Sequence, residues 1–322
     1  MSQNLSIPVV DMAGVAGGDA VSLLRAGQAI QRACTEIGFF YIVNHGVPQQ
    51  VIDEAMGAAR EFFALPLEVK VQVAVNARHR GFHRIGGATM YQATKPDLKE
   101  FFSIGLELAE DDPCVVAGEA LRGPNQWPAF LPRLRAALEA YYAAVGRAGA
   151  DLLRAVAVSL GIDEDFFAGK YHKPLQRTQA IYYPPHPPMA EADLFGVAPH
   201  TDYGCITLLY QDDSGGLQVR ELGGQRWVDA TPLAGSLVVN VGDLLARWSN
   251  DRFRSTLHRV INKSGHERYS IATFFDPNYQ ALVDPRDLGI GDAQSLYPPV
   301  KAGDYILRRI DESMAYRKKV QA

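Results

Sequence analysis

Two histidines and an aspartate in this sequence have the types and spacing to hold a metal ion. His200 and Asp202 stand two residues apart in the segment 199–204, and His258 follows much later. Side chains two apart on a β-strand point to the same face, so an extended segment 197–203 would place the first two side by side. Two imidazoles and one carboxylate leave half of an octahedral site open, which is typical of non-haem Fe(II) oxygenases. Zinc hydrolases can use the same ligands, so this set alone leaves both classes open.

An arginine and a serine after the second histidine indicate a small acid as a further reactant. Arg268 and Ser270 are again two residues apart, on either side of Tyr269. A guanidinium and a hydroxyl on one face can receive a carboxylate through charge-assisted hydrogen bonds. Tyr183, on an earlier predicted strand, could add a phenolic donor. We expect an acid that binds Arg268 at one end and chelates the metal at the other, and 2-oxoglutarate has this shape.

The turn between His258 and Arg268 must direct both side chains into one cavity. The segment 263–267 has the composition of a hairpin turn. Opposed residues of an antiparallel pair share a face, so the number of loop residues decides which side chains lie together. A three-residue loop, 264–266, would pair Lys263 with Glu267 and turn both site residues to the same side. We therefore expect this hairpin, with its loop residue His266 exposed to solvent.

The elements that position these residues change in character along the chain. Apolar residues at helical spacing predict helices over 21–37, 49–64 and 131–161 and within 298–319, and an aromatic run predicts a strand over 39–43. The Gly- and Pro-containing stretch 111–128 is typical of a loop. From about residue 176, turn signals separate short runs typical of an all-β barrel or sandwich, at 179–183, 197–203, 207–211, 217–220, 227–229, 236–240, 257–262 and 269–275. We expect an α+β chain whose β-rich core is a jelly roll, with helices packed on its outside.

Composition argues against several classes of function. The chain has 322 residues, of which 47% are hydrophobic and 21% charged, enough to bury a large core. Its net charge of −4 gives no general basic surface for nucleic acid or membranes. The cysteines Cys34, Cys114 and Cys205 are odd in number and far apart, which is typical of a reducing cytoplasm rather than of a disulfide framework. We expect a cytoplasmic monomer that acts on a small molecule and binds neither nucleic acid nor a membrane.

Longer motifs make nearly the whole chain similar to a known family. The segments concerned are 7–11, 38–47, 80–82, 182–185, 200–202, 215–219, 240–243, 257–260 and 268–270. They resemble the isopenicillin N synthase-like family of Fe(II)/2-oxoglutarate-dependent oxygenases. The resemblance implies a distorted double-stranded β-helix with N-terminal and central helices around it. It also implies O2 as a reactant and the oxidation of a small molecule, by hydroxylation or otherwise, with release of succinate and CO2.

The resemblance assigns roles to residues and to regions. It implies Fe(II) on His200, Asp202 and His258, and the 2-oxoglutarate carboxylate on Arg268, Ser270 and Tyr183. It divides one structural domain into an N-terminal helical and strand region (1–120), a long central helix region (121–172), the dioxygenase core (173–280) and a C-terminal helical extension (281–322).

Two positions depart from the family pattern or invite a second interpretation. Ile181 stands where some plant members have an asparagine that contacts the oxo-acid head, so that contact is absent here. The penicillin-forming branch keeps the arginine and serine without using 2-oxoglutarate, so this pair alone does not establish the cosubstrate. That branch also ligates iron with a glutamine next to its last residue. Gln321 occupies that place here, and we expect a chain end without this role.

The substrate and the product are not fixed by these motifs. The region 80–102, the loop 184–194 and the inner face near Phe275 should line a substrate pocket, with His83, Tyr91 and Phe275 as candidate contacts. Within the family, the alternatives are an isopenicillin N synthase-like oxidation and the formation of ethylene with succinate. From other classes, a zinc hydrolase on a β-barrel would explain neither Arg268 nor Ser270. A non-catalytic metabolite sensor is disfavoured by the intact ligand set.

Overall fold

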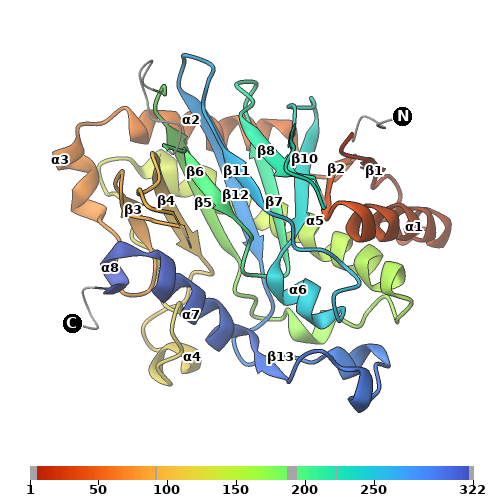
Figure 1. Ribbon diagram of the computed structural model, residues 1–322. Helices are drawn as coiled ribbons and strands as arrows, with labels where there is room; N and C mark the ends of the chain where they lie inside the picture. Colours follow the sequence, from red (N-terminus) through yellow and green to blue (C-terminus); the bar gives the residue numbers. More distant parts are fainter. Residues whose placement is uncertain (1–5, 91–92, 187–193, 222, 319–322) are drawn as a thin grey trace.

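Two β-sheets face each other and enclose the predicted site. The computed structural model describes residues 6–90, 93–186, 194–221 and 223–318 (Figure 1). Its larger sheet has eight strands in the order β1-β2-β10-β7-β12-β5-β4-β3, and its smaller sheet has four in the order β6-β11-β8-β9. Side chains from both sheets line one shared cavity, as the two walls of a jelly roll do. The expected architecture is therefore confirmed.

The strands agree closely with the runs predicted from the sequence. The larger sheet contains β1 (Val9–Asp11), β2 (Phe39–Val43), β3 (Gly81–His83), β4 (Glu100–Gly105), β5 (Arg177–Tyr183), β7 (Ile206–Gln211), β10 (Ser236–Val241) and β12 (Arg268–Phe275). The smaller sheet contains β6 (Val197–His200), β8 (Leu217–Arg220), β9 (Trp227–Asp229) and β11 (His258–Val260), and β13 (Leu282–Val283) pairs with β14 (Val300–Lys301). The pairing of β1 with β2 is parallel and the other ladders are antiparallel.

Helices cover the outer face of the larger sheet, where α2 and α5 lie behind the strands in Figure 1. The helices are α1 (Ala20–Glu36), α2 (Gln49–Phe63), α3 (Leu67–Lys70), α4 (Pro113–Val116), α5 (Pro132–Leu160), α6 (Asp243–Trp248), α7 (Ala302–Ser313) and α8 (Ala315–Lys318). The short α4 lies inside the stretch predicted as a loop. Alanine-rich α5 begins with a proline at its first position and ends where Gly161 adopts a φ of 78°, a conformation that favours glycine at a helix end. No helix of the described residues is both long and apolar enough to cross a membrane.

The N-terminal region completes the wall of the β core. Strand β2 pairs with β10, with Phe39 opposite Asn240. The Phe39 ring consequently lies edge-on to the His258 imidazole, with 5.2 Å between ring centroids. Buried apolar residues from Ile7 to Met314 form one hydrophobic cluster. Segments far from the site in sequence therefore help to hold its side chains in place.

The predicted strand over 197–203 is too long. Strand β6 ends at His200, Asp202 lies outside the strand, and the chain bends at 203–205. The backbone N–H of Asp243, the first residue of α6, donates to the Asp202 carbonyl at 2.8 Å, and the N–H of Leu244 donates to the Gly204 carbonyl at 2.9 Å. These bonds hold the segment 202–204 against the start of α6. They replace the ladder bonds that an extended Asp202 would have made.

The predicted hairpin between His258 and Arg268 is also wrong. Strand β11 belongs to the smaller sheet and β12 to the larger one, so the segment between them crosses from one sheet to the other. Asn262 holds this crossover: its Nδ2 donates to the His266 carbonyl at 2.7 Å and to the Pro184 carbonyl at 3.0 Å. The count of loop residues consequently does not determine which side chains share the cavity. His266 is exposed, as expected.

Candidate active site

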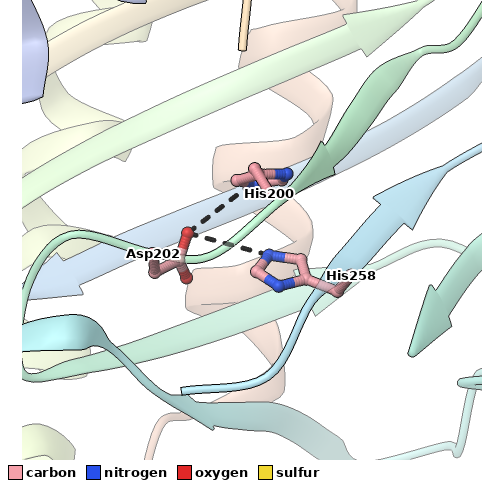
Figure 2. A group of neighbouring side chains, drawn as sticks. All are labelled: His200, Asp202 and His258. Carbon is pink, nitrogen blue, oxygen red and sulfur yellow. Dashed lines mark ion pairs between the residues drawn. The ribbon is translucent and has the colours of Figure 1, made fainter. Parts of the chain in front are cut away.

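The two histidines and the aspartate meet between the sheets (Figure 2). The Nε2 atoms of His200 and His258 each lie 3.7 Å from Oδ1 of Asp202. The register of β6 and β11 sets His200 directly opposite His258. An ion with bonds of about 2.1 Å can bridge donors up to about 4.2 Å apart, so these separations fit one shared metal. Among the residues that the structure describes, these three form the group suited to hold a metal ion.

Backbone contacts fix which nitrogen each imidazole presents. Nδ1 of His200 lies 2.9 Å from the Ala198 carbonyl, and Nδ1 of His258 lies 3.1 Å from the Thr256 carbonyl. A carbonyl only accepts, so each Nδ1 carries the proton and each Nε2 offers a lone pair. Burial, and after it the nearby His258, lower the pKa of His200 to about 3, although Asp202 opposes the shift. His200 is therefore neutral and ready to ligate at physiological pH.

Two hydrogen bonds orient the Asp202 carboxylate. Its Oδ2 accepts from Thr207 Oγ1 at 2.6 Å and from Asn240 Nδ2 at 2.7 Å. Burial alone would raise the pKa of Asp202, but the two imidazoles and these hydrogen bonds outweigh burial and lower it. The carboxylate is held ionised, with Oδ1 free to face the histidines. The residues present fit a divalent ion bound on one face.

The Thr207 contact supplies a first testable prediction. Replacing Thr207 with valine keeps the shape of the side chain but removes one donor to Asp202. Loss of a hydrogen bond to a metal ligand typically weakens metal binding by about 10- to 100-fold. We expect the Fe(II) affinity to fall within this range, and anaerobic titration measures it.

A matched control for this prediction exists on β12. Thr273→Val removes another buried bond, from Thr273 Oγ1 to Thr178 Oγ1 at 2.9 Å. That change should lower thermal stability and leave Fe(II) affinity unaltered. Equal affinity of Thr207→Val and the unmodified protein would show that this contact does not position the ligand.

A buried guanidinium lies at the other end of the site. Arg268 is fully buried, and its donors reach the Gly215 carbonyl (2.6 Å), Gln211 Oε1 (3.2 Å) and Ser270 Oγ (3.3 Å). Its guanidinium lies 4.6 Å from the centroid of the Tyr183 ring, because Arg268 and Tyr183 are opposed in the β12–β5 ladder. No carboxylate of the described chain forms an ion pair with Arg268. A buried cation without an acidic partner is a receptor for an anionic ligand.

A cavity of about 70 Å³ adjoins the three candidate metal ligands and Tyr183. Tyr183, Ile181 and the three candidate metal ligands line it, together with Phe39, Lys99, Gln179, Val197, Thr207, Leu209, Leu217, Asn240, Val260, Ala272 and Phe274. Arg268 and Ser270 are not themselves among the lining residues, because the arginine is bonded to Gly215, Gln211 and Ser270. It touches the cavity wall through Tyr183. The cavity thus has the candidate metal ligands on its wall, with a buried guanidinium packed behind Tyr183.

Comparison with known proteins decides the family. Residues 174–277 match the family described as the 2OG-Fe(II) oxygenase superfamily, and residues 7–130 match the one described as non-haem dioxygenase in morphine synthesis N-terminal. The chain is 37% identical to the 2-oxoglutarate-Fe(II) type oxidoreductase hxnY of Emericella nidulans, over 97% of this chain and 93% of that protein. The chain belongs to the 2OG-Fe(II) oxygenase superfamily.

Other relatives give the same assignment. The oxygenase is 34% identical to homoarginine-6-hydroxylase 2-ODD-C23.1 of Arabidopsis thaliana, over 94% of this chain and 93% of that protein. It is 30% identical to a full-length Neurospora crassa protein whose crystal structure contains alpha-KG and thymine, with a TM-score of 0.84 and coverage of 97% of this chain and 98% of that chain. It is a non-haem iron, 2-oxoglutarate-dependent dioxygenase, which oxidises a small molecule with release of succinate and CO2.

Two of the residues predicted to contact the substrate lie outside the lining of this cavity. Phe275 does not line the cavity of the oxygenase: it packs against α5, where a Cβ on Gly149 would lie 2.8 Å from its ring. Its neighbour Phe274 lines the cavity instead. His83 is buried and stacks on Phe101 with 3.8 Å between ring centroids, outside the lining of this cavity. Tyr91 and Gln321 lie outside the described residues.

Sequence reasoning missed four polar residues of the site. Thr207 and Asn240 hold Asp202, Gln211 accepts from Arg268, and Lys99 lines the cavity. A signal was present for Asn240, because it is the lone amide in the otherwise apolar run of β10 and is buried. Thr207 carries no such signal, since threonine is common on strands.

Proposed function

We propose that the oxygenase binds Fe(II) through His200, Asp202 and His258, and the distal carboxylate of 2-oxoglutarate through Arg268. In this proposal Ser270 and Tyr183 complete the acid-binding end. When bound, Fe(II) supplies the activation of O2 at the coordination positions that the protein leaves open. The protein residues orient the cosubstrate, exclude water and present the small molecule to that face.

One observation carries this proposal. Three candidate ligand atoms of His200, Asp202 and His258 face one another. The fully buried Arg268 guanidinium, without an acidic partner in the described chain, lies behind Tyr183, which lines the same cavity. A zinc hydrolase needs no such cation. Arg268 contacts Tyr183, which lines the same cavity as the metal ligands, and this supports a small diacid that is chelated at one end and paired with arginine at the other.

The cavity has a volume of about 70 Å³, which supports action on a small molecule. Cys34, Cys114 and Cys205 are free, which supports action in a reducing cytoplasm.

Anaerobic reconstitution tests the proposal directly. With Fe(II) and 2-oxoglutarate we expect the weak visible charge-transfer band of an iron–oxo-acid chelate, and after admission of O2 we expect succinate. Zn(II)-loaded protein is the matched control and should give neither. A band without succinate or 2-oxoglutarate consumption would favour the isopenicillin N synthase-like alternative, and ethylene in the headspace would favour the ethylene-forming one. Absence of the band with Fe(II), together with hydrolysis supported by Zn(II), would refute the proposal.

A further inference from the structure

A second cavity adjoins the first and carries buried cations on its wall. It has a volume of about 60 Å³ and shares Lys99, Gln179, His200, Asp202 and Phe274 with the first cavity. Its remaining wall comes from distant segments, through His79, Met90, Arg177, Tyr203, Ile310 and Met314. Two candidate metal ligands thus face this space as well, which is what a site for the molecule to be oxidised requires.

Lys99 places an ammonium group at the junction of the two cavities. The side chain is 8% exposed, and its Nζ lies 3.3 Å from Asp97 Oδ2. Burial by itself lowers the pKa of Lys99, but Asp97, with Tyr183 and Tyr203, outweighs burial and raises the pKa, so the group is charged. An ammonium has three donors, and Asp97 is its only ion-pair partner in the described part of the chain. Donors therefore remain for a ligand in the cavity.

Arg177 provides a second cation on the same wall. Its NH2 donates to Asp276 Oδ2 at 3.0 Å, and its guanidinium lies 5.0 Å from the centroid of the Phe274 ring. Its Nε is buried and has no hydrogen-bond partner among the described residues. The guanidinium is thus held in place by one carboxylate and one aromatic ring, with hydrogen-bonding capacity left unused.

Asp97 and Asp276, the acidic partners of Lys99 and Arg177, also accept hydrogen bonds from the backbone on either side of Asp202. Asp97 Oδ1 accepts from the Ala198 N–H at 3.1 Å, and Asp276 Oδ1 accepts from the Cys205 N–H at 2.8 Å. Asp276 also packs closely on Gly204, where a Cβ would lie 1.7 Å from Oδ1. Each carboxylate is therefore engaged with the segment 198–205. The cations that they hold line the second cavity, and neither acid is among its lining residues.

Arginines also lie around His79 on the wall of this cavity. Burial holds the pKa of His79 well below its usual value, and the neighbouring His83, Arg177, Arg80 and Arg317 lower it further. Arg80 is buried and donates to the carbonyls of Arg78 and Leu121. It forms no ion pair with the described acidic residues. The second cavity thus has two cations on its wall, each paired with one carboxylate.

We propose that the second cavity binds the molecule to be oxidised and that this molecule is a small organic carboxylate. Its anionic group binds Lys99, on the wall that also carries Arg177 and Gln179, while its carbon skeleton lies against Phe274, Met314 and Ile310, near His200 and Asp202. The inference rests on the function proposed above. A neutral molecule would leave buried ammonium donors facing an uncharged group, which is the weaker arrangement.

Matched pairs of probes test this inference without knowledge of the natural substrate. Benzoate against benzamide, and butyrate against butyramide, differ in charge but little in shape. Each probe is titrated anaerobically into the Fe(II)–2-oxoglutarate enzyme, and the shift of the charge-transfer band reports binding. We expect the carboxylates to bind about 10- to 100-fold more tightly than their amides, the range of a hydrogen bond to a charged group.

Variants of Lys99 assign the preference to this residue. Lys99→Met should abolish it, and Lys99→Arg should keep most of it because the charge remains. The double variant Asp97→Asn with Lys99→Met leaves no buried carboxylate unpaired, so it should show the same loss even if the single variant is unstable. Affinity for 2-oxoglutarate is measured in all three variants as well, because Lys99 also lines the first cavity.

The possible outcomes separate this inference from the function on which it rests. Amides that bind as tightly as carboxylates, or no binding of either carboxylate, would overturn the inference while the charge-transfer band remains. Loss of 2-oxoglutarate affinity in Lys99→Met would also overturn it, because Lys99 would then serve the cosubstrate. Absence of the band in the unmodified enzyme would instead contradict the proposed function.

Discussion

Replacing Asp202 with asparagine is expected to abolish Fe(II) binding and 2-oxoglutarate turnover. The side-chain oxygen at the δ2 position accepts from both Thr207 and Asn240. An asparagine must keep its carbonyl oxygen there, because its NH2 would face two donors. That places the NH2 group at the Oδ1 position, 3.7 Å from each histidine Nε2, where it cannot ligate a cation.

The loss of Fe(II) affinity in Asp202→Asn should exceed the loss caused by removing a hydrogen bond to a metal ligand, as in Thr207→Val. Outer contacts typically contribute about 10- to 100-fold in metal affinity or activity, and Asp202→Asn removes the only anionic ligand of the proposed set. Fe(II) titration and succinate formation measure the two effects. Asp213→Asn is the matched control, since Asp213 is exposed and should show neither effect. Near-normal turnover by Asp202→Asn would remove the aspartate from the ligand set.

The candidate ligands could be predicted from residue types, although the structural reason for their proximity could not. The alternation argument required His200 and Asp202 to share a strand, whereas β6 ends at His200. The aspartate reaches the site from a turn that the first residues of α6 hold. His258 joins them because β11 lies beside β6. The residue types in short segments predict the ligands, but the pairing of β6 with β11 depends on residues far away in sequence.

One error could have been avoided with the information in the sequence. Arg268 and Ser270 occupy even positions of β12, so strict alternation places Ala272 and Phe274 on their face and Phe275 on the other. The structure follows this alternation, with Ala272 and Phe274 in the cavity lining and Phe275 against α5. The register of β12 therefore argues against Phe275 as a contact in this cavity.

Other parts of the site depend on contacts that no local pattern encodes. Lys99 precedes β4 and lies in the cavity because β4 pairs with β5, which carries Tyr183 and Gln179. The hairpin expected between β11 and β12 failed for a related reason. Turn composition at 263–267 is compatible with a hairpin and with a crossover between sheets, and the choice is made by which strands pair.

Replacing Arg268 with glutamine is expected to weaken binding of 2-oxoglutarate strongly while Fe(II) binding persists. The guanidinium is fully buried and is the cation nearest Tyr183 and Ser270 at the acid-binding end. Truncating one partner of a buried, hydrogen-bonded charge pair costs about 2–5 kcal/mol, equivalent to about 30-fold to several thousand-fold in affinity. Anaerobic titration of the Fe(II) enzyme with 2-oxoglutarate measures this change through the charge-transfer band.

The choice of variants separates charge from geometry. Arg268→Lys keeps the charge but loses the planar fork that matches a carboxylate, so its affinity for 2-oxoglutarate should fall between those of the unmodified enzyme and Arg268→Gln. Arg226→Gln, which removes an exposed arginine paired with Glu221, is the control and should bind normally. Because neither Arg268 variant alters a metal ligand, Fe(II) affinity separates a specific loss of the acid receptor from general damage. Unchanged 2-oxoglutarate affinity in Arg268→Gln, with iron still bound, would mean that the acid is received elsewhere, with Lys99 as the next buried cation to test.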